Sequence, residues 1–138
     1  MPSWLLKTEP STYSFDDLAR DRKTRWDGVS NAQAQANLRA MRVGDPVVVY
    51  HSGEKAAVGL ARVSRAAFPD PGDPGGKRVA VEIAAGARLA APVPLEALRA
   101  EGAFEGSPLL RQGRLSVVPL TAAQARVVQV LARRRGQA

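Results

Sequence analysis

Cysteine is absent from this chain of 138 residues, and histidine occurs once, as His51. The chain therefore has no disulfide and no thiolate metal ligand, and a zinc site would need carboxylates for nearly every ligand. No apolar run approaches the roughly 18–20 residues that cross a membrane. The first residues, Met1-Pro2-Ser3-Trp4, lack the basic and apolar regions of a signal peptide. We expect a cytoplasmic protein without metal, cofactor or membrane contact.

Acidic residues are in the minority, and the formal net charge is +7 at pH 7. This balance favours a polyanionic partner such as nucleic acid, because clustered Arg and Lys attract phosphates. Solvated surface charge explains it as well, since Arg133-Arg134-Arg135 would complement the dipole at the end of a helix. With 45% hydrophobic residues, the length predicts one globular domain over residues 1–138.

Aromatic rings make up only 5% of the chain and are unevenly distributed. Every Trp and Tyr, and the single His, lie within the first 51 residues, and most stand beside polar side chains. The rest of the chain relies on Leu, Val and Ala for its core. The asymmetry indicates a site that stacks on a planar group and hydrogen-bonds its edges, as a nucleobase pocket does.

Apolar stretches bounded by turn residues predict strands at residues 4–7, 47–50, 57–63, 78–84 and 115–118. Capping residues and helical spacing predict helices at about 15–20, from Ser30 or Asn31 to Gly44, at about 95–100, and after Thr121. Charged residues 20–25 and the Pro/Gly-rich residues 68–76 are expected to be loops. Sequential, hairpin-like turns between the strands indicate an α+β domain on a small, strongly curved sheet or open barrel.

Lys7-Thr8-Glu9 leave a buried strand and offer an ammonium, a hydroxyl and a carboxylate, the mixture of donors and acceptors that a base edge needs. The alternative is an exposed Lys7/Glu9 pair with Thr8 turned inward. In Trp26–Asn31, a ring, a carboxylate and the flexible Gly28 precede a helix N-terminus, which suits a ring and an anion together. The alternative is that Trp26 only covers the core.

His51 and Ser52 are neighbours on one predicted strand, so their side chains point to opposite faces and do not form a nucleophile and base pair. Ser52 is expected to share a face with Tyr50. For His51, the alternative to a functional role is a buried imidazole bonded to backbone. The paired carboxylates Asp16-Asp17 and Asp70/Asp73 are explained by capping and turn formation.

Segments spread over nearly the whole chain resemble the EVE domain family. They are Trp4–Pro10, Tyr13-Ser14, Asp17-Leu18, Trp26–Val29, Asn31, Leu38–Met41, Gly44-Asp45, Tyr50–Ser52, Phe68–Pro71 and Arg114–Pro119. The resemblance implies a PUA-like fold, a curved open β-barrel of about five to six strands flanked by short helices. It also implies a noncatalytic module that binds DNA or RNA and recognises a modified base.

By this resemblance, Trp26 would stack on a flipped base, Asp27 and Asn31 would bond its edge, and the Lys7-Thr8 backbone would complete recognition. The implied pocket comprises Lys7, Thr8, Trp26, Asp27, Val29 and Asn31, closed from the neighbouring strand by Tyr50, His51 and Ser52. Many members carry Arg at Ser30 and Arg-Asn at Gln35-Ala36, so this helix offers two fewer cations. Candidates for phosphate contact are Arg39, Arg42, Arg111 and Arg114.

The expected protein is thus a monomeric or weakly dimeric nucleic-acid-binding module. An enzyme acting on a small nucleotide-like molecule is the alternative, with Glu9 or Asp27 as base and His51 as proton carrier. A third possibility is a scaffold for a protein partner, for which binding would be insensitive to salt.

Overall fold

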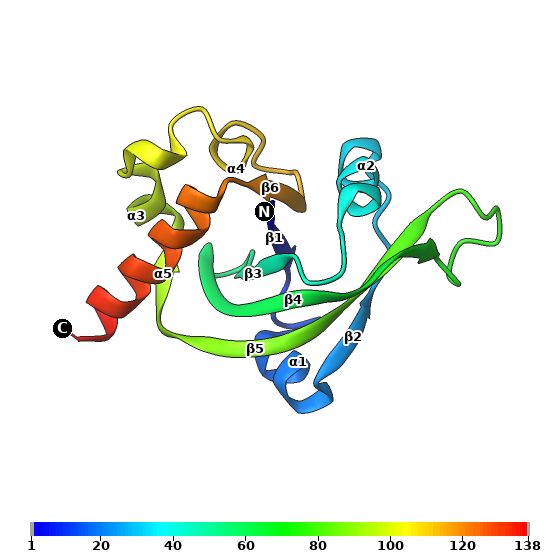
Figure 1. Cartoon of the computed structure of the whole chain (residues 1–138), viewed down its shortest axis with the longest axis horizontal. Coiled ribbons are helices and arrows are strands. Elements are labelled where there is room, and N and C mark those ends of the chain that lie inside the picture. Colours follow the sequence, from blue (N-terminus) through cyan, green and yellow to red (C-terminus); the bar gives the residue numbers. More distant parts are fainter. Residues whose placement is uncertain (1, 138) are drawn as a thin grey trace.

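The computed structural model describes residues 2–137. Within them, six strands form one mixed sheet in the order β2-β5-β4-β3-β1-β6, with helices around it (Figure 1). The strands are β1 (Ser3–Thr8), β2 (Lys23–Trp26), β3 (Pro46–His51), β4 (Ala56–Pro69), β5 (Val79–Pro94) and β6 (Val117–Leu120). The helices are α1 (Phe15–Asp21), α2 (Ala32–Ala40), α3 (Leu95–Arg99), the 3-10 helix η1 (Gly102–Phe104), α4 (Pro108–Arg111) and α5 (Ala122–Gly136).

The central strands β1 and β3 are parallel, which differs from the sequential hairpins expected from the sequence. Residues 9–45, with α1, β2 and α2, form the crossover that a parallel pair requires. Their register places Lys7 beside Tyr50 and Thr8 beside His51. The carboxyl ends of both strands therefore meet at one edge of the sheet, together with the polar residues that follow them.

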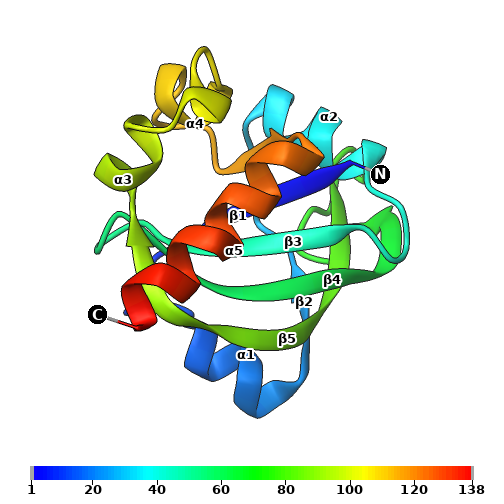
Figure 2. The ribbon, with the colours of Figure 1, turned by 60° about the vertical axis from the view of Figure 1, so that its left-hand side comes forward.

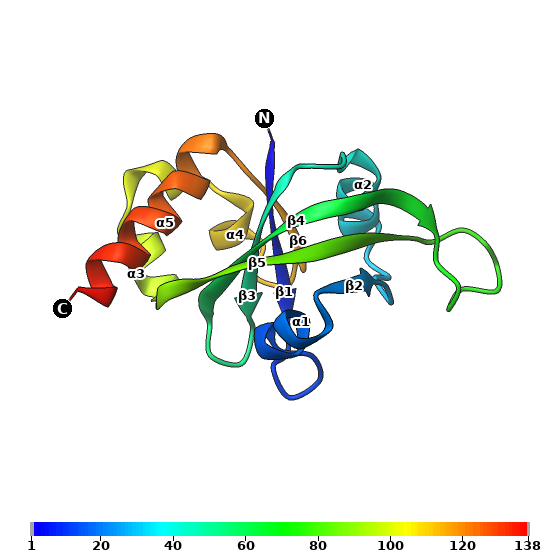
Figure 3. The same ribbon diagram turned by 60° about the horizontal axis from the view of Figure 1, so that its bottom comes forward.

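The boundaries of two regions differ from expectation. The charged segment expected to be a loop includes β2, which pairs with β5 from Lys23 to Trp26. Strand β5 continues well past the predicted end at residue 84, because its pairing with β4 tolerates several register shifts. These two strands run side by side to the connection at residues 70–78 (Figure 3). Neither η1 nor α4 was predicted from the sequence.

Local capping predictions are confirmed. The Ser14 and Asp17 side chains and backbone groups form a capping box at α1, and Thr121 and Gln124 form another at α5. Asn31, rather than Ser30, caps α2. Helix α2 ends at Ala40, before the expected stop at Gly44.

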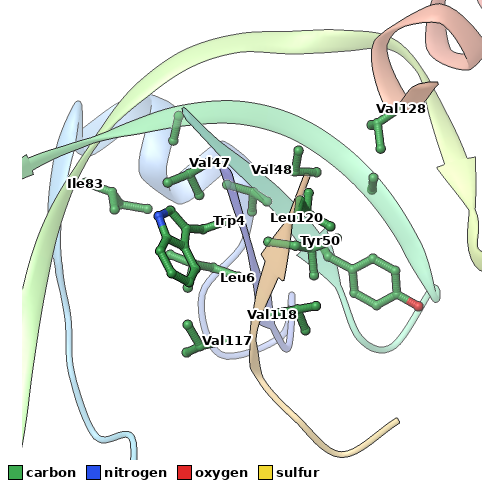
Figure 4. Close-up of a cluster of buried hydrophobic side chains, with 14 of the residues drawn as sticks. Trp4, Leu6, Val47, Val48, Tyr50, Ile83, Val117, Val118, Leu120 and Val128 are labelled. Carbon is green, nitrogen blue, oxygen red and sulfur yellow. The ribbon is translucent and has the colours of Figure 1, made fainter. Parts of the chain in front are cut away.

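A continuous core joins the sheet to its helices. Figure 4 shows side chains from β1, β3, β5 and β6 packing together, with Val128 of α5 beside them. Strands β1 and β3 are buried on both faces, and α5 crosses one side of the sheet (Figure 2). Phe15 of α1 is 1% exposed and packs against Gly59 of β4, where any Cβ would meet the ring.

The α+β class and the six strands agree with the prediction. The end strands β2 and β6 are not paired with each other, so the sheet is not closed and a barrel is not confirmed. No helix among residues 2–137 is long and apolar enough to span a membrane.

Candidate functional site

A pocket of about 750 Å³ opens where the carboxyl end of β1 meets β2 and the segment leading into α2. It is lined by Lys7, Thr8, Glu9, Thr12, Tyr13, Thr24, Arg25, Trp26, Asp27, Gly28, Val29, Ser30, Asn31, Arg114 and Ser116. Eight of the eleven residues predicted from the sequence are among them: Lys7, Thr8, Glu9, Trp26, Asp27, Gly28, Val29 and Asn31. Residues 7–9 lie at the carboxyl end of β1, and residues 26–31 lie in the long crossover between the parallel strands β1 and β3, which brings the two segments together.

Trp26 forms the apolar wall of the pocket. It is the last residue of β2, it is 9% exposed, and the ring of Tyr13 meets it edge-on with the centroids 6.5 Å apart. Within residues 2–137, no side-chain nitrogen or oxygen is both fully buried and without a hydrogen-bond partner. Because no hydrogen bond of the Trp26 Nε1 is found among these residues, this nitrogen must be at least partly accessible to solvent.

Trp4 provides a contrast. Its indole is 5% exposed in the core, and its Nε1 donates to Asp45 Oδ2 at 3.0 Å. Asp45 also accepts the backbone N–H of Arg42. The two tryptophans of the chain therefore differ in surroundings: Trp4 is a core residue whose N–H is hydrogen-bonded, whereas Trp26 packs on the core and also lines the pocket, with no hydrogen bond found for its N–H among residues 2–137.

The polar residues that end β1 are held individually and do not pair with one another. Lys7 Nζ donates to the Gly113 carbonyl at 2.9 Å and lies 5.6 Å from the centroid of the Tyr50 ring. Burial lowers the pKa of Lys7. Thr8 Oγ1 donates to the Tyr13 carbonyl at 2.7 Å, which closes the turn after β1. The exposed Lys7/Glu9 pair considered as an alternative is not present.

On the opposite wall, Asp27 and Asn31 frame the entrance to α2. Arg25 Nε donates to Asp27 Oδ2 at 2.8 Å, and this bond raises the pKa of the arginine. Asn31 Oδ1 accepts the Ala34 N–H at 2.9 Å, so capping occupies its carbonyl and leaves its amide NH₂ facing outward. The pocket thus combines a carboxylate, an amide, several hydroxyls and a ring.

Tyr50, His51 and Ser52 do not line the pocket. They do not close it as expected, because β3 is buried on both faces, which leaves Tyr50 and His51 only 3% and 7% exposed. His51 Nε2 accepts the Phe15 N–H at 3.0 Å, and His51 Nδ1 lies 2.7 Å from Glu54 Oε1. The imidazole is therefore a structural residue bonded to backbone, carrying its proton on Nδ1.

Four arginines were predicted to contact phosphate, and the structure separates them. Arg114 lines the pocket beside Lys7. Arg39 donates to the Lys77 carbonyl at 2.7 Å and so ties α2 to the β4–β5 connection. Arg42 and Arg111 are exposed but lie outside the pocket lining.

Six pocket residues were not predicted as site residues: Thr12, Tyr13, Thr24, Arg25, Ser30 and Ser116. All of them except Ser30 lie outside the two segments expected to form the pocket, residues 7–9 and 26–31. Two more act from behind the pocket. Asp70 accepts the Gly28 N–H, and Gln35 donates to the Val29 carbonyl. Gln35 is 4% exposed, so this position faces the interior and not a ligand. Tyr13, Ser30, Ser116, Gln35 and Asp70 lie in segments already noted for the family resemblance or for helix capping, whereas Thr12, Thr24 and Arg25 carried no sequence signal.

Comparison with known proteins identifies the family. A model described as the EVE domain matches residues 3–131. Human thymocyte nuclear protein 1 is 39% identical over 80 residues, which cover 49% of this chain and 36% of the human protein. The match therefore spans only about a third of that relative's length.

Solved structures agree with this assignment. Rpa0253 from Rhodopseudomonas palustris is 39% identical, with a TM-score of 0.90 over 96% of this chain and 94% of that one. Human THYN1 protein, in complex with 5-methylcytosine containing DNA, is 29% identical, with a TM-score of 0.85 over 96% and 98%. The YTH domain of Zygosaccharomyces rouxii MRB1 protein, at 12% identity and a TM-score of 0.61, shares the fold. Since the family model covers nearly all of it, this chain belongs to the EVE domain family.

Proposed function

We propose that this chain is a noncatalytic nucleic-acid-binding module that takes one base, in a modified form, into the pocket beside Trp26. The observation that carries the proposal is the state of that indole. Trp26 is one of the residues that line a pocket of about 750 Å³, and no hydrogen bond of its N–H is found among residues 2–137. A stacked base would cover the face, and an acceptor on the ligand would satisfy the donor.

The groups around Trp26 suit the edge of a base. Asp27 supplies acceptors, Asn31 supplies a free amide NH₂, and the hydroxyls of Ser30 and Ser116 supply both kinds of group. Val29, 8% exposed, adds an apolar contact next to the ring. Such a mixture discriminates between bases, because an unmatched ligand edge would leave buried polar groups unpaired.

Positive charge at the rim suits the phosphates that flank a flipped base. Arg114, Lys7 and Arg25 all line the pocket. The human THYN1 protein was solved with DNA that contains 5-methylcytosine, which supports nucleic acid as the ligand class for a relative of this fold. For this chain we extend the proposal to a modified base in DNA or RNA.

The alternative of acid–base catalysis loses its proton carrier. His51 lies outside the pocket lining, and both of its ring nitrogens are engaged, one by the Phe15 N–H and one by Glu54. General acid–base catalysis needs a titratable group within hydrogen-bond reach of the substrate. We therefore propose a reader and no catalytic activity.

The test is a binding panel of single-stranded and duplex oligonucleotides that carry different modified bases, 5-methylcytosine among them. Trp26→Ala should weaken binding of the preferred oligonucleotide by roughly 5- to 150-fold, because base–aromatic stacking contributes about 1–3 kcal/mol. Trp26→Phe keeps an aromatic face for stacking and loses the N–H, so its affinity should lie between those of the wild type and Trp26→Ala.

Thermal denaturation of each variant separates lost binding from lost folding. Equal affinities of the wild type and Trp26→Ala for every oligonucleotide would refute the pocket assignment. Turnover of free nucleosides that disappears in His51→Ala, with oligonucleotide binding unchanged, would instead establish the enzyme alternative.

A further inference from the structure

The segment that forms the polar wall of the pocket, residues 27–31, has no regular secondary structure of its own. Gly28 adopts a positive φ of 70°, which lets the chain turn sharply between β2 and α2. A short irregular segment holds one shape only if its backbone groups are bonded from outside. Two buried side chains supply such bonds, and neither lines the pocket.

The first is Asp70, which directly follows β4 and is 4% exposed. Its Oδ2 accepts the Gly28 N–H at 3.0 Å, across 42 residues of sequence. Its Oδ1 accepts the Gly72 N–H at 2.8 Å, which starts the turn of the β4–β5 connection. Turn formation, the explanation suggested by the sequence, accounts for only one of its two oxygens.

The second is Gln35 of α2, also 4% exposed. Its Nε2 donates to the Val29 carbonyl at 2.7 Å and to the Val79 carbonyl at 3.1 Å, while its Oε1 accepts the Val79 N–H at 2.8 Å. The amide is thus fully committed between the pocket segment and the first residue of β5. No part of it is left to contact a ligand.

The two side chains bond adjacent residues of the pocket segment and connect them to the two ends of the β4–β5 connection. Asp70, at the start of this connection, accepts the Gly28 N–H. Gln35 donates to the Val29 carbonyl and accepts the N–H of Val79, the residue that follows the connection. We propose that Gln35 and Asp70 are positioning residues that fix the shape of segment 27–31, and thereby the affinity and base selectivity of the pocket. This inference rests on the proposed function.

The physical argument is one of preorganisation. The binding-competent shape of segment 27–31 must be populated before a base can bind, and apparent affinity falls with the fraction that has this shape. Both side chains are buried and hydrogen-bonded, so loss of Asp70 frees the Gly28 N–H, and loss of Gln35 leaves the carbonyl of the buried Val29 unpaired. The segment would then relax toward other conformations.

Two variants with little change in side-chain volume test the positioning role. Asp70→Asn replaces one of the two accepting oxygens by an NH₂ group. Gln35→Met removes both the amide NH₂ donor and the amide oxygen acceptor. Each should weaken binding of the preferred modified oligonucleotide about ten-fold and reduce its preference over the unmodified one. Gln35→Glu, which keeps the acceptor for Val79 and loses the donor to Val29, should bind no better than Gln35→Met.

The chain offers a matched control for each variant. Asp45, 3% exposed, also accepts two hydrogen bonds, and Gln124, 7% exposed, also bridges a helix to another segment. Asp45→Asn and Gln124→Met should lower the melting temperature by similar amounts while the ratio of modified to unmodified binding stays constant. Loss of that preference to the same degree in the controls would reduce Gln35 and Asp70 to ordinary stabilising residues and overturn the proposal.

A ligand-free measurement keeps the two proposals separable. Amide hydrogen exchange, followed by NMR, should accelerate at Gly28 in Asp70→Asn and at Val79 in Gln35→Met, the two amides whose N–H groups these side chains accept, and not in the two controls. Unchanged exchange at Gly28 and Val79 would overturn the positioning role even if binding changed. If the wild type binds no oligonucleotide in the panel, the proposed function fails, while exchange still decides whether these side chains hold the segment.

Discussion

The contact between Gly59 and Phe15 allows a specific test of how α1 is docked on the sheet. A Cβ added at Gly59 would lie 2.2 Å, 2.3 Å and 2.5 Å from three ring atoms of Phe15. The ring cannot easily retreat, since it is 1% exposed and the Arg88 guanidinium lies 5.2 Å from its centroid. In addition, the Phe15 N–H is bonded to the buried His51. Gly59→Ala should therefore force either α1 or β4 to shift.

Overpacking of a well-filled core costs about 1–3 kcal/mol, and we expect the upper end, because three ring atoms conflict at once. An unfolding entropy of about 2 cal/mol/K per residue makes 3 kcal/mol equivalent to a decrease of roughly 10 °C in melting temperature for a chain of this length. Phe15→Leu should offset part of this loss in the Gly59→Ala background, since the smaller side chain vacates the space. A positive coupling in that double-mutant cycle would identify the contact as the cause.

Thermal denaturation followed by circular dichroism measures the effect. Gly102→Ala is the matched control, because a Cβ there meets nothing within 4 Å, and its melting temperature should remain close to that of the wild type. Equal melting temperatures for Gly59→Ala and Gly102→Ala would refute the packing argument. Additive losses in the Gly59→Ala/Phe15→Leu pair would refute it as well.

Three further predictions concern single side chains. His51→Ala should cost about 1–3 kcal/mol of folding stability, because it leaves the Phe15 N–H unpaired, and should change oligonucleotide affinity far less; denaturant unfolding and a binding titration together check this. Arg114→Gln should reduce the slope of log affinity against log salt by about one unit if Arg114 contacts a phosphate, and an unchanged slope would exclude that contact. Backbone N–H groups of Arg78, Gly75 and Lys77 lower the pKa of Asp73, so its stabilising effect is present above about pH 4 and is lost as pH falls through the lower pKa of the folded state. Asp73→Asn should therefore flatten the acid side of the melting-temperature profile below about pH 4, and a profile parallel to that of the wild type there would contradict this.

Features that depend on neighbouring residues were predictable from the sequence. The capping boxes at Ser14 and Thr121 and the cap at Asn31 involve groups only three residues apart, so the sequence contains the whole interaction. The buried strands β1 and β3 are short apolar runs bounded by turn residues, and their positions were predicted to within one or two residues.

Elements stabilised by distant partners were not predictable in the same way. Strand β2 consists mostly of charged and polar residues and is a strand because β5 pairs with it. Strand β5 passes its predicted end because β4, with several register shifts, accompanies it. The parallel arrangement of β1 and β3 follows from the crossover between them, which no local pattern specifies.

The candidate site likewise has a part that depends on neighbouring residues and a part that depends on distant ones. Segments 7–9 and 26–31 were singled out because chemically suitable side chains follow one another in the sequence, and all nine of their residues line the pocket, including Ser30, which was not predicted as a site residue. Arg25 and Tyr13 join them only through folding, and Gln35 and Asp70 support the wall across gaps of 6 and 42 residues. His51 was misplaced because β3 is buried on both faces, and neither this burial nor the hydrogen bond from the Phe15 N–H can be read from the neighbouring residues.

By itself, the sequence determined which segments could carry a ring, a carboxylate and an amide, where the helices begin, and which strands are buried, because these properties depend on residue type and short spacing. Only the tertiary structure decided that Trp26 lines a pocket while Trp4 fills the core, and that Asp70 holds Gly28 in place. Exposure and long-range hydrogen bonds are properties of the packed chain, and two identical indoles acquire different roles only when the sheet places an acceptor beside one of them.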